Sequence, residues 1–243
     1  MSFDVIVALI IIGVALLVFI IAVAGMFLFL QSEPVIDTSY GLPLVVGGIL
    51  AIIIFSWIGL FVRSIITYVL LSTVIQASYF ILDAGSAILV GKSLWFAVLQ
   101  ALNFTIAGGL FMLGFALLYF NMKKQDLVDY AGIYEKNKFL VLAISVSCLS
   151  LGGMAGFNIY VGEFLLYSFL FAIHPALALS AIFAGLVCFL FYFRICYTLM
   201  VRKSDASLSF PLPLKLAAAA LTILVVVLGV VPHILFGVLE VFA

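Results

Sequence analysis

The segment from Phe139 to Ile173 constrains the fold most, because it is apolar over 35 residues and yet contains the ionisable Glu163. At ~1.5 Å per residue, a continuous helix of this length would be ~52 Å long, whereas the hydrocarbon core of a membrane is ~30 Å thick. Three glycines between Gly152 and Gly156, followed by Asn158, stand where a break would relieve the excess length. A carboxyl group beside a helix break inside a membrane predicts a functional site.

The rest of the chain is also predominantly apolar. Hydrophobic residues make up 68% of the sequence and charged residues 8%, against roughly half and a quarter in soluble proteins. The longest part without a strong apolar run is 121–138, which is too short to bury a core of its own. We therefore predict an all-α polytopic protein, with one transmembrane domain over residues 1–243 embedded in the lipid bilayer. A net charge of zero suggests no nucleic-acid partner.

The apolar runs predict about seven transmembrane helices. They are expected at residues 4–30, 42–62, 64–82, 94–120, 139–173, 176–200 and 216–231. Asp83, Gly85 and Lys92 are expected to form the turn after the third helix, with Asp83 and Lys92 near the outer interface. Pro211 and Pro213 are expected to close the loop before the last helix.

The loop charges decide how often residues 139–173 cross the membrane. If they crossed twice, the basic loops at 123–138 and 202–215 would lie on opposite sides. If they cross once, as a helix broken near Gly152–Asn158, both loops lie on the same side as Arg63. The positive-inside rule favours the single crossing. It places the N-terminus inside and the C-terminus outside a cell membrane.

Glu163 is the main candidate for a proton or ion pathway. An unpaired carboxylate in lipid is costly, so this side chain must be protonated or face protein, water or a cation. The alternative is a structural role, in which a neutral Glu163 forms hydrogen bonds with backbone carbonyls that the break leaves free.

Four other polar residues lie within apolar spans. Gln76, Asn103 and Thr105 can either hold water along an ion pathway or form hydrogen bonds between helices. Arg194 can reach the cytoplasmic interface with its long side chain, pair two helices, or act as the charge partner of Glu163.

The sequence gives little sign of enzymatic chemistry. Its three cysteines lie within apolar spans without a CxxC pair, and the two histidines each stand beside a proline. No phosphate-binding loop or nucleophile–base pair is recognisable. We therefore expect no catalytic residue, no metal ligand and no bound cofactor.

Several segments together resemble the antiporter-like membrane subunits of respiratory complex I, of Mrp cation/proton antiporters and of energy-converting hydrogenases. LGGMAGFNIYVGEF resembles the glycine-rich break of that family that ends in G-E/K-F, in its Glu-bearing M-type form. STVIQASYFIL and LNFTIAGGLFMLG are similar to two family helices that carry histidines. QDLVDYAGIYEKNK and LGVVPHIL resemble the family's conserved loop and its terminal segment.

This resemblance implies half of an antiporter-like fold. Full-length members have about fourteen helices in two inverted repeats, and this chain resembles the last seven. In the family, Lys, Glu and His residues relay protons along the membrane midplane. Of these family groups, only the Glu is matched by a titratable residue in this chain, namely Glu163. Gln76 and Asn103 stand where the family has histidines. Gln and Asn can hold water but do not take up a proton near neutral pH. The implied relay is therefore degenerate.

The resemblance favours a non-catalytic membrane subunit of a proton- or sodium-translocating oxidoreductase complex, such as an energy-converting hydrogenase or a complex-I-like assembly. Its partners would be other membrane subunits and protons or sodium ions, and any redox centres would belong to those subunits. Two alternatives remain at this stage. The chain can be a self-standing cation/proton transporter that acts as a homodimer, or a purely structural subunit.

Overall fold

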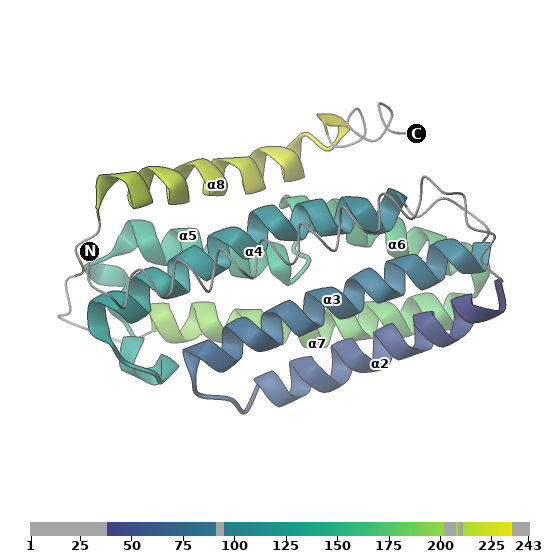
Figure 1. Cartoon of the computed structure of the whole chain (residues 1–243), viewed down its shortest axis with the longest axis horizontal. Coiled ribbons are helices and arrows are strands. Elements are labelled where there is room, and N and C mark those ends of the chain that lie inside the picture. The colour runs from purple at the N-terminus through teal and green to yellow at the C-terminus, as the bar shows by residue number, and fades with distance from the viewer. Residues whose placement is uncertain (1–37, 91–94, 202–207, 209–210, 235–243) are drawn as a thin grey trace.

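The computed structural model of the chain describes residues 38–90, 95–201, 208 and 211–234 (Figure 1). The α-helices in this part are α2 (Gly41–Gly59), α3 (Ile65–Val90), α4 (Trp95–Met122), α5 (Lys138–Leu151), α6 (Asn158–Ile173), α7 (Pro175–Met200) and α8 (Leu212–Val230). Short 3₁₀ turns lie at η1 (Thr38–Tyr40), η2 (Leu127–Tyr130) and η3 (Ile133–Glu135). The helix expected at 4–30 and the residues Arg202 and Lys203 lie outside the described residues.

Helices α5 and α6 together make one interrupted crossing. Five described helices are long and apolar enough to span a membrane, while α5 and α6 are each shorter apolar helices. They lie one after the other along the length of the bundle, and α7 runs beside both (Figure 1). Helix α4 also contacts both halves. The predicted all-α membrane fold with a helix broken near Gly152–Asn158 is therefore confirmed.

The connections on either side of α3 and α5 determine which loops share an end of the bundle. The turn after α2 and the loop between α4 and α5 lie at the same end, which we call the loop end (Figure 1). There the backbone N–H of Ile65 donates to Gln125 O over 2.8 Å, and that of Leu127 donates to Arg63 O over 2.8 Å. The N–H of Gly132 reaches Thr198 O near the end of α7. The end of α7, which precedes the second basic loop, therefore lies beside the loop 123–137, as a single broken crossing requires.

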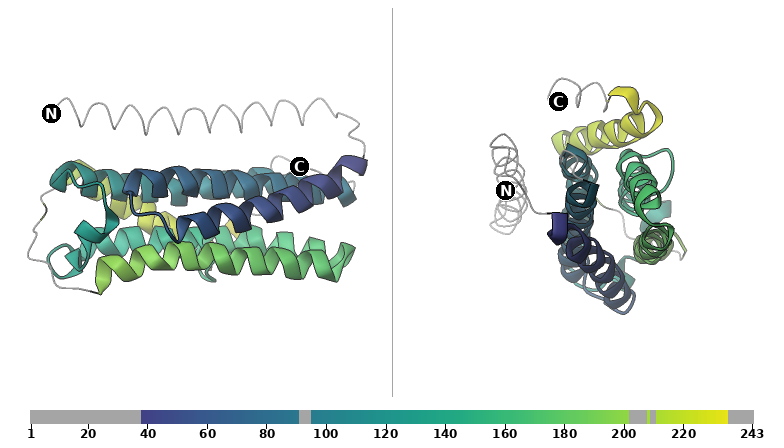
Figure 2. Two further views of the ribbon diagram at one scale, coloured as in Figure 1. Left: turned by 90° about the horizontal axis from the view of Figure 1, so that it is seen from below. Right: turned by 90° about the vertical axis from the view of Figure 1, so that its right-hand side faces the viewer.

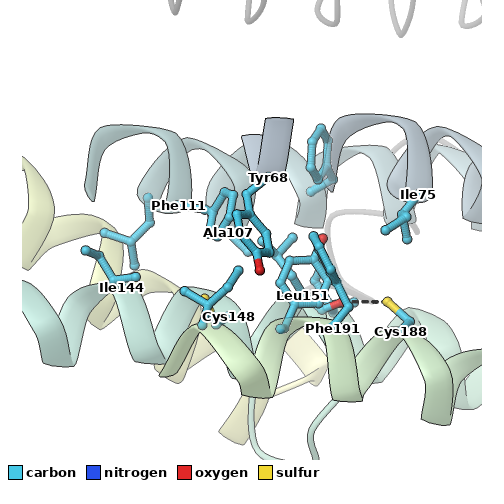
Figure 3. Packing of buried hydrophobic residues seen from close by; sticks show 14 of the residues in the cluster. Tyr68, Ile75, Ala107, Phe111, Ile144, Cys148, Leu151, Cys188 and Phe191 are labelled. Atoms are coloured by element: carbon cyan, nitrogen blue, oxygen red, sulfur yellow. Dashed lines mark hydrogen bonds between the residues drawn. The ribbon is translucent and has the colours of Figure 1, made fainter. Parts of the chain in front are cut away.

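The helices form two facing layers (Figure 2). One contains α2, α3 and α4, the other contains α5, α6 and α7, and α8 lies across α4, α5 and α6. Aromatic side chains fill the space between the layers (Figure 3). The rings of Tyr68 and Phe191 stack with centroids 5.4 Å apart, and Phe111 meets Tyr192 edge-on at 5.9 Å. The outward faces are also apolar, as expected for helices that contact lipid.

The third predicted helix is longer than expected, and Asp83 and Gly85 lie inside it and not in a turn. Helix α3 continues to Val90 because Gly85 lets the α2 backbone pack directly against it. A Cβ at Gly85 would lie only 2.8 Å from the Val45 nitrogen and 3.0 Å from the Gly41 oxygen. The expectation that Asp83 and Gly85 form a turn is therefore wrong, and Asp83 is buried inside the bundle. Lys92 lies outside the described residues.

The last helix begins earlier than predicted. Helix α8 starts at Leu212, so Pro213 occupies its first turn and does not close the preceding loop. Proline is tolerated there because the first backbone N–H groups of a helix have no partner within the helix. Between α6 and α7, His174 forms the predicted turn before Pro175. Its Nδ1 accepts a hydrogen bond from the Ala176 N–H.

Candidate functional site

The break between α5 and α6 depends on two glycines and on side chains from neighbouring helices. Gly153 and Gly156 have φ values of +74° and +94°, a left-handed conformation that costs other residues about 1–2 kcal/mol. The break frees the carbonyl of Leu151, which accepts hydrogen bonds from Gln76 Nε2 at 3.1 Å and from Cys188 Sγ at 3.8 Å. Figure 3 shows the contact between Leu151 and Cys188. Helices α3 and α7 thus hold the broken end in place.

Glu163 lies in the second turn of α6 and is only 3% exposed. Its Oε2 accepts a hydrogen bond from the Tyr167 hydroxyl at 3.2 Å, while its Oε1 has no hydrogen-bond partner in the described part of the chain. Gly153 faces the same carboxyl group, and a Cβ at that position would overlap Oε2. The carboxyl group of Glu163 therefore rests directly against the backbone of the break.

One face of α3 presents a line of polar side chains towards this site. The line consists of Ser72, Gln76, Tyr79, Asp83 and Ser86, which are all buried. Their spacing of three or four residues places them on one side of a helix. Ser72 Oγ and the Tyr192 hydroxyl are 2.7 Å apart and share a hydrogen bond. The line runs along the length of α3 past the break.

Two phenol hydroxyls and a second carboxyl group lie in the neighbourhood of Glu163. Tyr79 and Asp83 are both close enough to interact electrostatically with Glu163. Gly185 of α7 leaves room for the hydroxyls, since a Cβ there would lie 2.5 Å from Tyr167 Oη and 3.3 Å from Tyr79 Oη. Within the described residues, neither Tyr79 Oη nor Asp83 Oδ2 has a hydrogen-bond partner.

A cluster of amide groups lies between α4 and the start of α6. Asn158 accepts a hydrogen bond from Ser150 Oγ at 2.8 Å and donates to the backbone oxygen of Asn103 at 2.9 Å. Both amide atoms of Gln100 are buried without a partner among the described residues. A Cβ at Gly162 would overlap Gln100 Oε1, so the missing side chain lets this amide approach α6 one residue before Glu163.

The structure brings together some of the predicted site residues and separates others. Gln76 lies at the break, and Asn103 lies in the amide cluster. The Thr105 hydroxyl donates to Ala101 O within its own helix, and no contact links it to Glu163 among the described residues. Arg194 reaches α2 instead of Glu163.

Arg194 joins the ends of two helices at the loop end. Its Nη1 donates to the backbone oxygens of Gly59 and Leu60, and its guanidinium lies 5.9 Å from the centre of the Tyr68 ring. These carbonyls terminate α2 and have no partner further along that helix. Of the three roles considered for Arg194, helix pairing is the one that these contacts describe.

The site residues that the sequence analysis missed are Tyr79, Asp83, Gln100 and Tyr167. A signal for three of them is visible in the sequence. Tyr79 and Asp83 continue the three- and four-residue spacing that starts at Ser72, and Tyr167 follows Glu163 by one helical turn. Only the packing of α4 against Gly162 reveals the role of Gln100.

The arrangement can bind protons, water or a small cation. Ionised carboxylates accept hydrogen bonds or coordinate cations, whereas amides and hydroxyls both donate and accept. Among the described residues, no three His, Cys, Asp or Glu side chains are grouped as a metal ion would require. The three cysteines, Cys148, Cys188 and Cys196, are buried free thiols.

Comparison with known proteins connects this chain to a family. Residues 3–189 match the family described as "NADH:quinone oxidoreductase/Mrp antiporter, TM". "NADH-quinone oxidoreductase subunit N" from Geobacillus sp. (strain WCH70) is 30% identical over 176 residues, which are 69% of this chain and 33% of that protein. The subunit of the same name from Bacillus anthracis is 26% identical over 147 residues, which are 58% of this chain and 28% of that protein.

Solved structures share the fold. A chain of the Mrp complex from Dietzia sp. DQ12-45-1b superimposes with a TM-score of 0.72 at 15% identity, over 82% of this chain and 46% of that one. A chain of respiratory complex I from Thermus thermophilus with bound aureothin gives a TM-score of 0.64 at 20% identity, over 79% of this chain and 44% of that one. The matches therefore cover about a third of the curated relatives and less than half of these structural neighbours.

Proposed function

We propose, from the premise that this chain belongs to the NADH:quinone oxidoreductase/Mrp antiporter membrane family, that it is an antiporter-like subunit in which Glu163 handles the translocated ion. The ion is a proton or a sodium ion. The subunit works within a multisubunit membrane complex and not as an enzyme on its own. The proposal rests on the family and on the surroundings of Glu163.

The observation that carries the proposal is the buried carboxyl group at the break. A buried polar atom without a partner costs about 1–3 kcal/mol, and Glu163 keeps one such oxygen while its other oxygen binds Tyr167. A purely structural glutamate would donate its one O–H to a freed backbone carbonyl when protonated, or accept hydrogen bonds from donors on both oxygens as an anion. The freed carbonyl of Leu151 is instead bound by Gln76 and Cys188. Glu163 is thus left available to an ion.

Other groups with spare hydrogen-bonding capacity extend the site. Gln76 Oε1 and Asn103 Nδ2 are buried without partners in the described part of the chain, as are both amide atoms of Gln100. Buried polar groups of this kind are usually satisfied by ordered water. We propose that Gln76 and Asn103 hold water on a path to Glu163, with Thr105, two residues further along α4, as another water-binding position. No second titratable group replaces the family's histidines at positions 76 and 103.

This degenerate relay suits a subunit that completes a path shared with its neighbours. Curated relatives carry the name of a NADH-quinone oxidoreductase subunit, and one structural neighbour comes from an Mrp complex. We therefore propose a complex-I-like assembly, of which an energy-converting hydrogenase is one form. The exposed basic residues Arg63, Lys123 and Lys124 at the loop end support a cytoplasmic location of that end in a cell membrane.

Purification in a mild detergent, followed by identification of the bound subunits, tests membership of a complex. We expect other membrane subunits together with a hydrogenase or quinone-reductase core. Recovery of the chain only as a homodimer would contradict this proposal.

Reconstitution of the purified chain alone tests the self-standing transporter. Cation flux driven by a pH gradient, and abolished by Glu163→Gln, would show that the chain needs no other subunit. The expected result is no flux above that of empty vesicles. A purely structural subunit differs from both, because it predicts that Glu163→Gln leaves translocation by the whole complex unchanged.

A further inference from the structure

Asp83 is a second buried carboxyl group that the family resemblance does not assign. It is 4% exposed, and its Oδ2 has no hydrogen-bond partner among the described residues. An acidic side chain inside a membrane is costly and is retained where it serves a function. A helix-stabilising role would need a donor on each oxygen, and the described residues supply none to Oδ2.

The position of Asp83 relates it to Glu163. The two carboxyl groups are close enough to interact electrostatically, and in a medium of low dielectric constant two neighbouring negative charges are unfavourable. Such a pair is stable when it shares one proton or a cation. The groups that face Glu163 in the described residues are Tyr79 and Asp83 from α3, Tyr167 from α6 and Cys188 from α7. None of them carries a positive charge, so protonation is the way in which the described residues can relieve the pair.

Tyr79 supplies a group that can connect the two carboxyls. It precedes Asp83 by one turn on the same face of α3, and it interacts electrostatically with Glu163. Its hydroxyl is buried, the whole side chain being 1% exposed, and it has no hydrogen-bond partner in the described part of the chain. A hydroxyl can accept one proton while donating another.

The direction of α3 determines which end of the bundle Asp83 is nearer to. The helix runs away from the loop end, and Asp83 lies seven residues before its last residue Val90, a distance of about 10 Å at ~1.5 Å per residue. The break between α5 and α6 lies in the middle of the bundle (Figure 1), and Glu163 contacts it at Gly153. Asp83 is therefore nearer than the break to the end of the bundle opposite the loop end.

We propose that Asp83 exchanges a proton with Glu163 and connects it to the membrane surface opposite the loop end. In the transfer, the O–H bond of the Glu163 carboxylic acid breaks and an O–H bond forms on the Asp83 carboxylate. When Tyr79 mediates the step, its hydroxyl donates its proton to Asp83 as it accepts one from Glu163, and so returns to its initial state. One negative charge moves from Asp83 to Glu163. This inference rests on the proposed function of Glu163 as the ion-handling residue.

Infrared titration of the purified complex that contains the chain, in lipid vesicles, tests the exchange. The carbonyl stretch of a protonated carboxyl group that is lost in Glu163→Gln identifies Glu163. We expect Asp83→Asn to move the midpoint of this Glu163 band by about one pH unit or more, because interacting groups titrate as a pair. Ser78→Ala removes a buried hydroxyl that donates to Val74 O and lies outside the polar line of α3, and Asp129→Asn removes an exposed loop carboxylate. Both controls should leave the midpoint in place.

Two results would overturn the inference in different ways. If the Glu163 band titrates with the same midpoint in Asp83→Asn as in the unmodified chain, Asp83 is not its partner, although Glu163 keeps its proposed role. If no band is lost in Glu163→Gln, Glu163 takes up no proton, which overturns both this inference and the proton form of the proposed function. Should Asp83→Asn not fold, Glu163→Gln provides the reciprocal measurement, because coupling shifts the Asp83 band by the same amount. An unshifted Asp83 band would then contradict the proposal.

Discussion

Gly153 lies against the carboxyl group of Glu163, so closely that a Cβ at position 153 would occupy the space of Oε2. The two residues are ten positions apart and belong to different parts of the broken helix, namely the break itself and the second turn of α6. The glycine therefore has two tasks. It adopts the left-handed backbone conformation that ends α5, and it leaves room for the acid.

The variants Gly153→Ala and Gly156→Ala separate these tasks. Both place alanine in a left-handed conformation, which should destabilise the protein by about 1–2 kcal/mol in each case. Only at Gly153 does the new methyl group also meet Glu163, since a Cβ at Gly156 has open space around it. We expect both variants to unfold at lower denaturant concentration in detergent, and only Gly153→Ala to lose ion translocation. Equal translocation by the two variants would show that contact with Gly153 does not position Glu163.

The hydrogen bond between Gln76 and Leu151 should stabilise the break. In Gln76→Leu, the freed carbonyl of Leu151 keeps only the weak Cys188 thiol as a donor, and we expect a loss of about 1–3 kcal/mol. Ser78→Ala is the matched control on the same helix, because the Ser78 hydroxyl donates to Val74 O one turn back. Unfolding followed by tryptophan fluorescence measures both variants. A Gln76→Leu protein as stable as Ser78→Ala would contradict this role.

The acid, the break and the overall helical architecture were predictable because each depends on local sequence. Glycines beside a long apolar run indicate a broken helix without any knowledge of its neighbours. The end of α3 was not predictable in this way. Asp83 and Gly85 look like a turn in the sequence, but tight packing of α2 against Gly85 keeps the helix intact and buries Asp83.

The partners of the site residues depend on packing between distant segments. Arg194 is 31 residues after Glu163 and has a suitable charge, yet the end of α2 supplies carbonyls that bind it. Gln100 is also distant from Glu163 in sequence, and only the absence of a side chain at Gly162 lets it approach. The polar face of α3 is the part of the site that could have been predicted, because it follows from residue spacing within one helix.

The loop end offers a pH-dependent prediction. Burial raises the pKa of Tyr130 from its ordinary value of 10.0 to about 12, and its hydroxyl donates to Lys124 O over 2.7 Å. Between these two pKa values the folded protein holds a proton that the unfolded chain has lost, so stability falls as pH rises from about 10 to 12. At lower pH this contribution is fully present.

Tyr130→Phe should remove that part of the pH dependence, together with one hydrogen bond worth about 0.5–1.5 kcal/mol. Unfolding in detergent at a series of pH values measures the effect, and Tyr134→Phe, in the same loop, is the comparison. If Tyr130→Phe and the unmodified chain lose stability in parallel above pH 10, the buried phenol is not the group responsible.

The most direct test of the account is ion translocation by the intact complex carrying Glu163→Gln, measured in sealed vesicles with assembly checked by co-purification. The substitution keeps the size of the side chain and removes its ability to change charge. We predict that the complex assembles normally and that translocation falls on the order of 100-fold, while Glu163→Asp retains part of the rate. Translocation by an assembled Glu163→Gln complex at the rate of the unmodified complex would contradict the claim that Glu163 handles the ion.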